Sequence, residues 1–150
     1  AAGMECYVRA ADLGDASAQF MMGHCLQNGI GVPKDAAAGV EWYRRAADQG
    51  NARAQFNLGY CHQNGIGVPI DEAIGMECFR RSAAQGSSDA QNHLGYCFKN
   101  GIGVPKDEAV GVDYFRRAAE QGDARAQNNF GDCLRNGIGV PKDEAAGVEW

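Results

Sequence analysis

The stretch Asn28-Gly29-Ile30-Gly31-Val32-Pro33 decides the fold, because the same six residues return at 64–69, 100–105 and 136–141. Each copy begins thirty-six residues after the previous one, and a period of about 20 to 50 residues is typical of stacked supersecondary units. The glycines favour positive φ angles that end a helix and turn the chain. The proline stops the helix from continuing. We expect the Ile and Val of each copy to fix the turn against the next repeat.

The segments between these copies have helical periodicity, with two helices in each repeat. Short polar side chains that can cap the first helix are Asp15, Asn51, Ser87 and Asp123. Those that can cap the second helix are Asp35, Asp71, Asp107 and Asp143. Glycines interrupt the first helix at one recurring position: Gly23, Gly59, Gly95 and Gly131. A glycine inside a helix costs about 1 kcal/mol relative to alanine, so this recurrence predicts that a neighbouring backbone comes close there.

We therefore expect an all-α fold, a right-handed α-solenoid of antiparallel helix hairpins with 36-residue repeats. Residues 1–150 form a single array in this interpretation. It consists of a half repeat at 1–17, full repeats at 18–53, 54–89 and 90–125, and a partial repeat at 126–150. Both ends stand in the same phase of the repeat and lack polar capping units, so the chain has the character of a section cut from an array.

Composition excludes several classes of protein. The formal net charge of −5 argues against a nucleic-acid-binding protein, which needs a basic face to neutralise phosphates. No apolar run approaches the roughly 20 residues that a membrane-spanning helix needs, and no signal peptide is visible.

The repeat resembles a known family. Ala-Gln-Phe-Asn-Leu-Gly-Tyr-Cys at 54–61, the Gly-x-Gly-Val-Pro loop and a second helix ending in Arg-Arg-Ala-Ala-x-Gln-Gly are similar to the Sel-one-like repeat (SLR), a relative of the tetratricopeptide repeat. The resemblance covers essentially the whole chain. It implies a non-enzymatic adaptor that assembles protein complexes.

The chain departs from the family's pattern in two ways. Many members carry alanine where this chain has Gly39, Gly75, Gly111 and Gly147. The cysteine-rich secreted branch, some of whose members are linked to β-lactam chemistry, carries short-spaced cysteine pairs that this chain lacks.

The cysteines are expected to be small buried thiols. Cys25, Cys61, Cys97 and Cys133 share one repeat position, and equivalent positions in such a stack lie roughly 18 Å apart, too far for a disulfide. Cys6 and Cys78 occupy the position of Trp42, Tyr114 and Trp150, which indicates core residues. Helix packing could still pair Cys6 with Cys25 and Cys78 with Cys97, and Cys61 with Cys78 is a rival pairing.

No catalytic, metal or cofactor site is predicted. The three histidines stand at different repeat positions without a zinc-binding spacing, and His62 is interpreted as a partly buried ring on an apolar face. The glycine-rich loop lacks the Gly-Lys-Ser/Thr of a phosphate-binding loop. Features that recur four times also indicate architecture, since a catalytic group should occur once.

The candidate binding site is the set of first-helix positions that differ between repeats on an otherwise repeated frame. We call this set the varied face, and we expect it to line the concave side of the solenoid. Its residues are Phe20, His24, Gln27, Phe56, Tyr60, Gln63, Asn92, Tyr96, Lys99, Asn128, Asp132 and Arg135.

Aromatic and amide side chains on such a face suit a protein or an extended peptide. The simpler interpretation is that Phe20 and Phe56 only pack the first helix of one repeat against the first helix of the next.

A second hypothesis is structural. The chain would then be a section of a much longer array, or copies would associate end to end into a filament, because a head-to-tail contact that does not close generates fibres.

Overall fold

The computed structural model describes residues 2–150, so Ala1, the first residue of the predicted half repeat, lies outside the described residues. Within residues 2–150 the chain forms nine α-helices and no strand, which confirms the expected all-α fold. The helices are α1 (Ala2–Asp12), α2 (Ala16–Asn28), α3 (Ala36–Asp48), α4 (Ala52–Asn64), α5 (Glu72–Ala84), α6 (Ser88–Asn100), α7 (Glu108–Glu120), α8 (Ala124–Asn136) and α9 (Glu144–Glu149).

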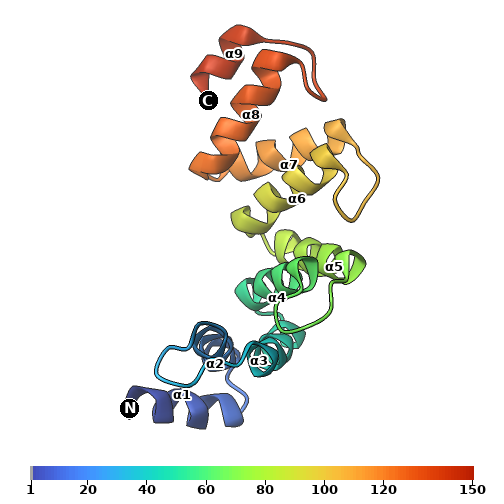
Figure 1. The fold of residues 1–150 in the computed structure, drawn as a ribbon. Helices are drawn as coiled ribbons and strands as arrows, with labels where there is room; N and C mark the ends of the chain where they lie inside the picture. Colours follow the sequence, from blue (N-terminus) through green and yellow to red (C-terminus); the bar gives the residue numbers. More distant parts are fainter. Residues whose placement is uncertain (1) are drawn as a thin grey trace. The chain divides into compact units, whose positions relative to one another are not determined.

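The chain divides into two compact units, one that ends at Ser82 and one that runs from Ala83 to Trp150. In the first unit, α1 packs on α2, α2 pairs with α3 as a hairpin, and α3 packs on α4 (Figure 1). In the second unit, α6 pairs with α7, α7 packs on α8, and α8 pairs with α9. Each repeat therefore contributes a first helix (α2, α4, α6 or α8) and a second helix that follows it.

The predicted helix caps are confirmed in both helices of the repeat. The Asp15 carboxylate accepts a hydrogen bond from the backbone N–H of Ala18 over 2.7 Å, and Asp107 accepts one from Val110 over 3.1 Å. At the other end of α2, Gly29 has a φ of 68°, the left-handed conformation that terminates a helix. These local interactions fix where each helix begins and ends.

The close backbone approach predicted at the recurring glycine is also confirmed. A Cβ atom on Gly23 of α2 would lie 2.9 Å from the carbonyl oxygen of Gly39 in α3, and 2.6 Å from a ring carbon of Tyr43. The same arrangement joins Gly95 of α6 to Gly111 of α7. The two glycines of a hairpin therefore face each other, which explains why both positions carry glycine.

The loop between the two helices packs in the direction opposite to the one expected. A Cβ atom on Gly67 would collide with the carbonyl group of Ala36, at the start of α3 in the preceding repeat. Gly139 stands in the same relation to Glu108 at the start of α7. The loop therefore lies on the first turn of the preceding second helix. Ile66 and Val68 pack against the core cluster to which this helix contributes, so they fix the turn to the previous repeat.

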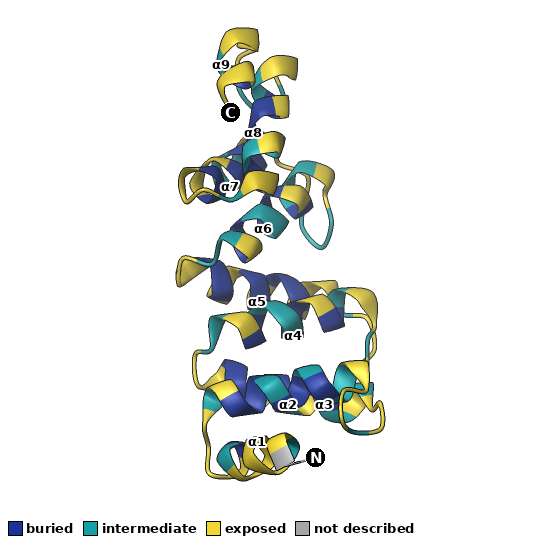
Figure 2. Ribbon diagram, turned by 90° about the vertical axis from the view of Figure 1, so that its left-hand side faces the viewer, coloured by how far each residue is buried: buried dark blue, intermediate teal, exposed yellow. Residues whose placement is uncertain are grey.

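The core of each unit lies between the second helix of one repeat and the first helix of the following repeat. Figure 2 shows buried residues along α2 and α3 and again within α7 and α8. The main cluster of the first unit contains Phe20 of α2, Val40, Tyr43, Ala46 and Ala47 of α3, Ala54, Leu58 and Cys61 of α4, and Cys78 of α5. The cluster of the second unit contains Val112, Phe115, Ala118 and Ala119 of α7 with Ala126, Phe130 and Cys133 of α8.

Candidate protein-interaction face

The first helices carry the varied face, and in the first unit a repeated glutamine bond holds α2 and α4 on the helix before each of them. The amide of Gln19 in α2 donates to the carbonyl of Ala11 in α1 over 3.2 Å, and Gln55 in α4 donates to Ala47 in α3 over 3.2 Å. Both glutamines are buried. The bond joins the start of a first helix to the last turn of the preceding second helix, so it sets the position of the varied face.

The structure divides the residues of the varied face by accessibility. The exposed ones are Tyr60, Tyr96, Asn128, Asp132 and Arg135. The half-buried ones are His24, Gln27, Phe56, Gln63, Asn92 and Lys99. Phe20 alone is buried.

Phe20 belongs to the core and not to an accessible surface. Its ring is 6% exposed, and its centroid lies 5.7 Å from that of Tyr43. The guanidinium of Arg53, from the following first helix, covers the ring at 4.5 Å from its centroid. Phe56 makes a similar contact, with its centroid 5.5 Å from that of Phe79. Both phenylalanines therefore contact the second helix of their own hairpin, and Phe20 also contacts the following first helix through Arg53.

Gln27 takes part in a polar network inside the first unit. Its side-chain oxygen accepts a hydrogen bond from the Tyr43 hydroxyl over 2.8 Å, and its amide nitrogen lies 3.7 Å from the sulfur of Cys61. Burial raises the pKa of Tyr43 to about 12 and that of Cys61 to about 11, so both groups stay neutral. Because the side-chain oxygen of Gln27 accepts the hydrogen bond of the buried Tyr43 hydroxyl, Gln27 has less hydrogen-bonding capacity left for a partner.

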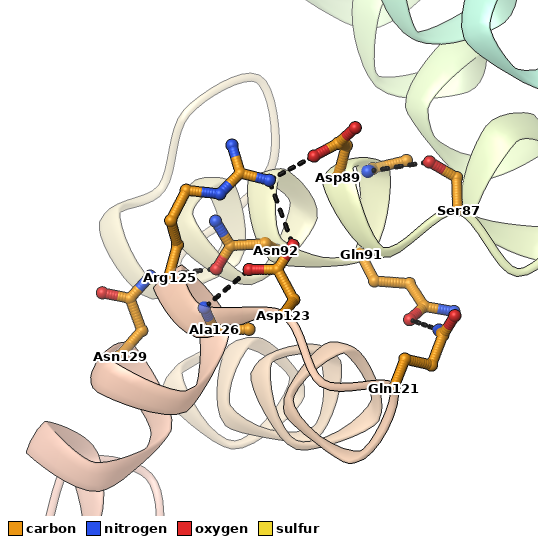
Figure 3. A network of polar contacts seen from close by, with 10 residues as sticks. Ser87, Asp89, Gln91, Asn92, Gln121, Asp123, Arg125, Ala126 and Asn129 are labelled. Carbon is orange, nitrogen blue, oxygen red and sulfur yellow. Dashed lines mark hydrogen bonds and ion pairs between the residues drawn. The ribbon is translucent and has the colours of Figure 1, made fainter. Parts of the chain in front are cut away.

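In the second unit, polar side chains link consecutive first helices (Figure 3). Arg125 of α8 forms ion pairs with Asp89 of α6 and with Asp123, and the amide of Asn129 donates to the side-chain oxygen of Asn92 over 2.9 Å. Asn92 is thus a connector between repeats. The sequence did not lead us to predict these contacts between first helices. A signal was present, because the charge alternates in sign at one repeat position, in Arg53, Asp89 and Arg125.

The asparagine at the start of each Asn-Gly-Ile-Gly-Val-Pro copy donates a side-chain hydrogen bond to a backbone carbonyl of the varied face. Asn64 donates to the carbonyl of Tyr60 over 3.0 Å, and Asn100 donates to that of Tyr96 over 2.9 Å. Both tyrosine side chains remain exposed, at 44% and 51%. The helix therefore presents an aromatic ring whose own backbone is already hydrogen-bonded.

All six cysteines are free thiols in this structure, and the disulfide pairings considered for Cys6, Cys25, Cys78 and Cys97 stay predictions. Five of the thiols are buried, as expected, and Cys6 is exposed. Cys6 was expected in the core, but no described helix covers its side of α1. Burial raises the pKa of Cys78 and Cys133, which keeps these thiols protonated and unreactive.

The described residues contain neither a metal-binding cluster nor a membrane-spanning helix. In residues 2–150 no group of three His, Cys, Asp or Glu side chains is arranged to hold a metal ion. None of the helices in the same range has the length and apolar character needed to cross a bilayer.

Comparison with known proteins gives matches over the whole chain. The model of the Sel1 repeat matches residues 1–15, 16–51, 52–87, 88–123 and 124–150. A protective antigen of uropathogenic Escherichia coli strains that displays an SLR fold is 37% identical, with a TM-score of 0.95, over 98% of this chain and 32% of that one. A Sel1 repeat protein from Oxalobacter formigenes is 36% identical, with a TM-score of 0.85, over 91% of this chain and 56% of that one.

The cysteine-rich protein B of Helicobacter pylori is more distant. It is 25% identical, with a TM-score of 0.56, over 58% of this chain and 65% of that one. The chain thus spans about a third and just over half of the length of the first two solved structures. No functionally curated protein matches the chain.

Proposed function

The chain belongs to the Sel1 repeat family, whose members generally serve as scaffolds for protein–protein interaction, and from this premise we propose that it binds an extended segment of a partner protein on the accessible part of its varied face. Each unit presents its own accessible part: Tyr60 with His24 and Gln63 in the first unit, and Tyr96 with Lys99, Asn128, Asp132 and Arg135 in the second. The proposed activity is binding, without catalysis.

The observation that carries this proposal is the exposure of two large aromatic side chains on rigid helices. Tyr60 and Tyr96 stand at one repeat position, and the opposite sides of α4 and α6 are buried. Tyrosine contributes a large contact area at a small cost in conformational entropy, and it is enriched among the residues that dominate binding energy.

The neighbouring polar groups suit a peptide backbone. An exposed amide side chain such as that of Asn128 can both donate and accept hydrogen bonds, which is what an extended peptide requires along its length. The charged residues of α8 contribute less, because Asp132 and Arg135 are ion-paired with each other.

Selection from a random-peptide library displayed on phage, with the intact chain immobilised, would supply a peptide ligand. Its affinity is then measured by calorimetry for the wild type, Tyr60→Ala and Tyr96→Ala. Loss of a dominant aromatic contact of about 2 kcal/mol weakens binding roughly thirtyfold, and we expect at least one of the two variants to show this.

Tyr7→Ala is the matched control, because Tyr7 is a tyrosine of similar exposure on α1, outside the varied face. Its affinity should equal that of the wild type. Unchanged binding by folded Tyr60→Ala and Tyr96→Ala would reject the proposed face. Light scattering on the same samples tests the competing hypothesis of end-to-end assembly, which requires particles larger than one chain.

A further inference from the structure

His62 occupies a position on α4 at which the other repeats carry apolar side chains. Its counterparts are Leu26, Phe98 and Leu134, and its own ring is 8% exposed. The backbone carbonyl of His62 accepts a hydrogen bond from Asp71 over 2.8 Å. The histidine therefore lies where the loop after α4 returns to the end of that helix, just before α5.

The buried ring is not fully hydrogen-bonded. Among the described residues, Nδ1 of His62 is the buried side-chain nitrogen or oxygen that has no hydrogen-bond partner. An unsatisfied buried polar atom costs about 1–3 kcal/mol, and the cost grows when the group carries a charge. The site accepts a neutral imidazole but offers no acceptor for the additional N–H of a protonated one.

On balance, the surroundings of the ring also disfavour its charged form. Burial has the largest effect, the Arg44 guanidinium of α3 adds repulsion, and the Asp71 carboxylate opposes them, so that the pKa of His62 is lowered. Arg44 is paired with Glu41 of its own helix. The Asp71 carboxylate accepts the backbone N–H of Ile74 over 3.0 Å and is not hydrogen-bonded to Nδ1 of His62.

We propose that His62 makes the first unit sensitive to acid: protonation of its ring places a second positive charge beside Arg44 and loosens the contact of α4 with α3 and with the segment before α5. This acid sensitivity does not depend on the proposed partner or on the varied face.

The direction of the effect follows from linkage. An unfolded histidine titrates near pH 6.5, and the folded pKa of His62 is lower, so the unfolded chain binds more protons at mildly acidic pH. The stability that the neutral ring contributes is complete above about pH 6.5 and falls as the pH drops toward the folded pKa. Between pH 7.5 and 5.5 the folding equilibrium constant can fall by at most about tenfold through this one group.

The test uses the intact chain with Trp150→Phe, so that Trp42 of α3 is the remaining tryptophan and reports on the first unit. Urea unfolding is followed by fluorescence at pH 7.5 and 5.5. The Trp150→Phe chain is the parent of the variants below. We expect its folding equilibrium constant to fall severalfold at the lower pH. With His62→Leu, the residue found at positions 26 and 134, we expect most of that fall to disappear.

His93→Asn is the matched control, because asparagine stands at the equivalent positions 57 and 129 and His93 lies in the second unit. This variant should keep the full fall in the Trp42 signal. If His62→Leu does not fold, His62→Phe replaces it, since phenylalanine occupies position 98. A parent whose stability does not change between the two pH values overturns the proposal, and so does an equal fall in parent and His62 variant.

Discussion

At the scale of single residues, Tyr43 shows how one repeat differs chemically from its neighbours. Its ring is fully buried, and the equivalent residues in the following repeats are Phe79 and Phe115. The additional hydroxyl is accommodated because Gln27 accepts its hydrogen bond. A buried hydroxyl without such a partner would be destabilising, so the two residues function as a pair.

Tyr43→Phe is expected to lower the free energy of unfolding by about 1 kcal/mol, because it removes this hydrogen bond and leaves the Gln27 oxygen without the phenol. Tyr7→Phe is the control, since Tyr7 is exposed and loses only contact with water. Both values come from urea unfolding followed by circular dichroism. Equal stability of Tyr43→Phe and the wild type would show that the phenol contributes nothing.

Residue-level accessibility was the part of the candidate site that the sequence predicted least well. The exposure of Tyr60 and Tyr96 follows from helical periodicity, which depends only on α4 and α6 themselves. The burial of Phe20 depends on Tyr43 and on Arg53, which arrive from two later helices. A single-helix pattern contains no information about that contact.

At the scale of helices, the facing glycines let the two helices of a hairpin approach closely. Gly111 of α7 is a clear case, since a Cβ atom there would lie 2.8 Å from the carbonyl oxygen of Gly95 and 2.9 Å from the backbone nitrogen of Lys99. Both are backbone atoms, which cannot move without shifting α6. Gly3 of α1 occupies the same repeat position and has no atom within 4 Å of its Cβ site.

This contrast gives a prediction with an internal control. Gly111→Ala should lower the free energy of unfolding by about 1–3 kcal/mol, the usual range for overpacking, after any gain from the better helix propensity of alanine. Gly3→Ala should be neutral or stabilise the chain by up to about 1 kcal/mol, because it gains propensity without a clash. The free energies of unfolding of both variants are measured by chemical unfolding. A stabilised Gly111→Ala would show that the two helices of the hairpin can accommodate the additional methyl group.

Helix boundaries were largely predictable because caps and stop signals are local. Asp15, Asp107 and Gly29 act within a few residues of their own positions. The glutamine bonds were not predictable, because Gln19 and Gln55 look like ordinary polar surface residues until the preceding helix is placed beside them. The prediction that the loop packs on the next repeat was wrong for the same reason, because the direction of the loop depends on packing between repeats.

At the scale of the whole molecule, stability is distributed among contacts between neighbours in the chain. The cluster of the first unit draws mainly on α3 and α4, and that of the second unit on α7 and α8. In such an array, stability is approximately a sum of repeat terms and nearest-neighbour interface terms. A local defect should then weaken its own hairpin and the next interface more than distant repeats.

Hydrogen exchange measured by mass spectrometry tests this distribution directly. In Gly111→Ala we expect faster exchange in α6, α7 and α8, because α7 packs on both of the others. Peptides from α2 and α3 should exchange at the wild-type rate, since local opening samples contiguous cooperative units. Gly3→Ala serves as the reference for a substitution without a clash. Uniformly faster exchange from α2 to α8 in Gly111→Ala would instead mean that the repeats open together, and nearest-neighbour additivity would not describe this chain.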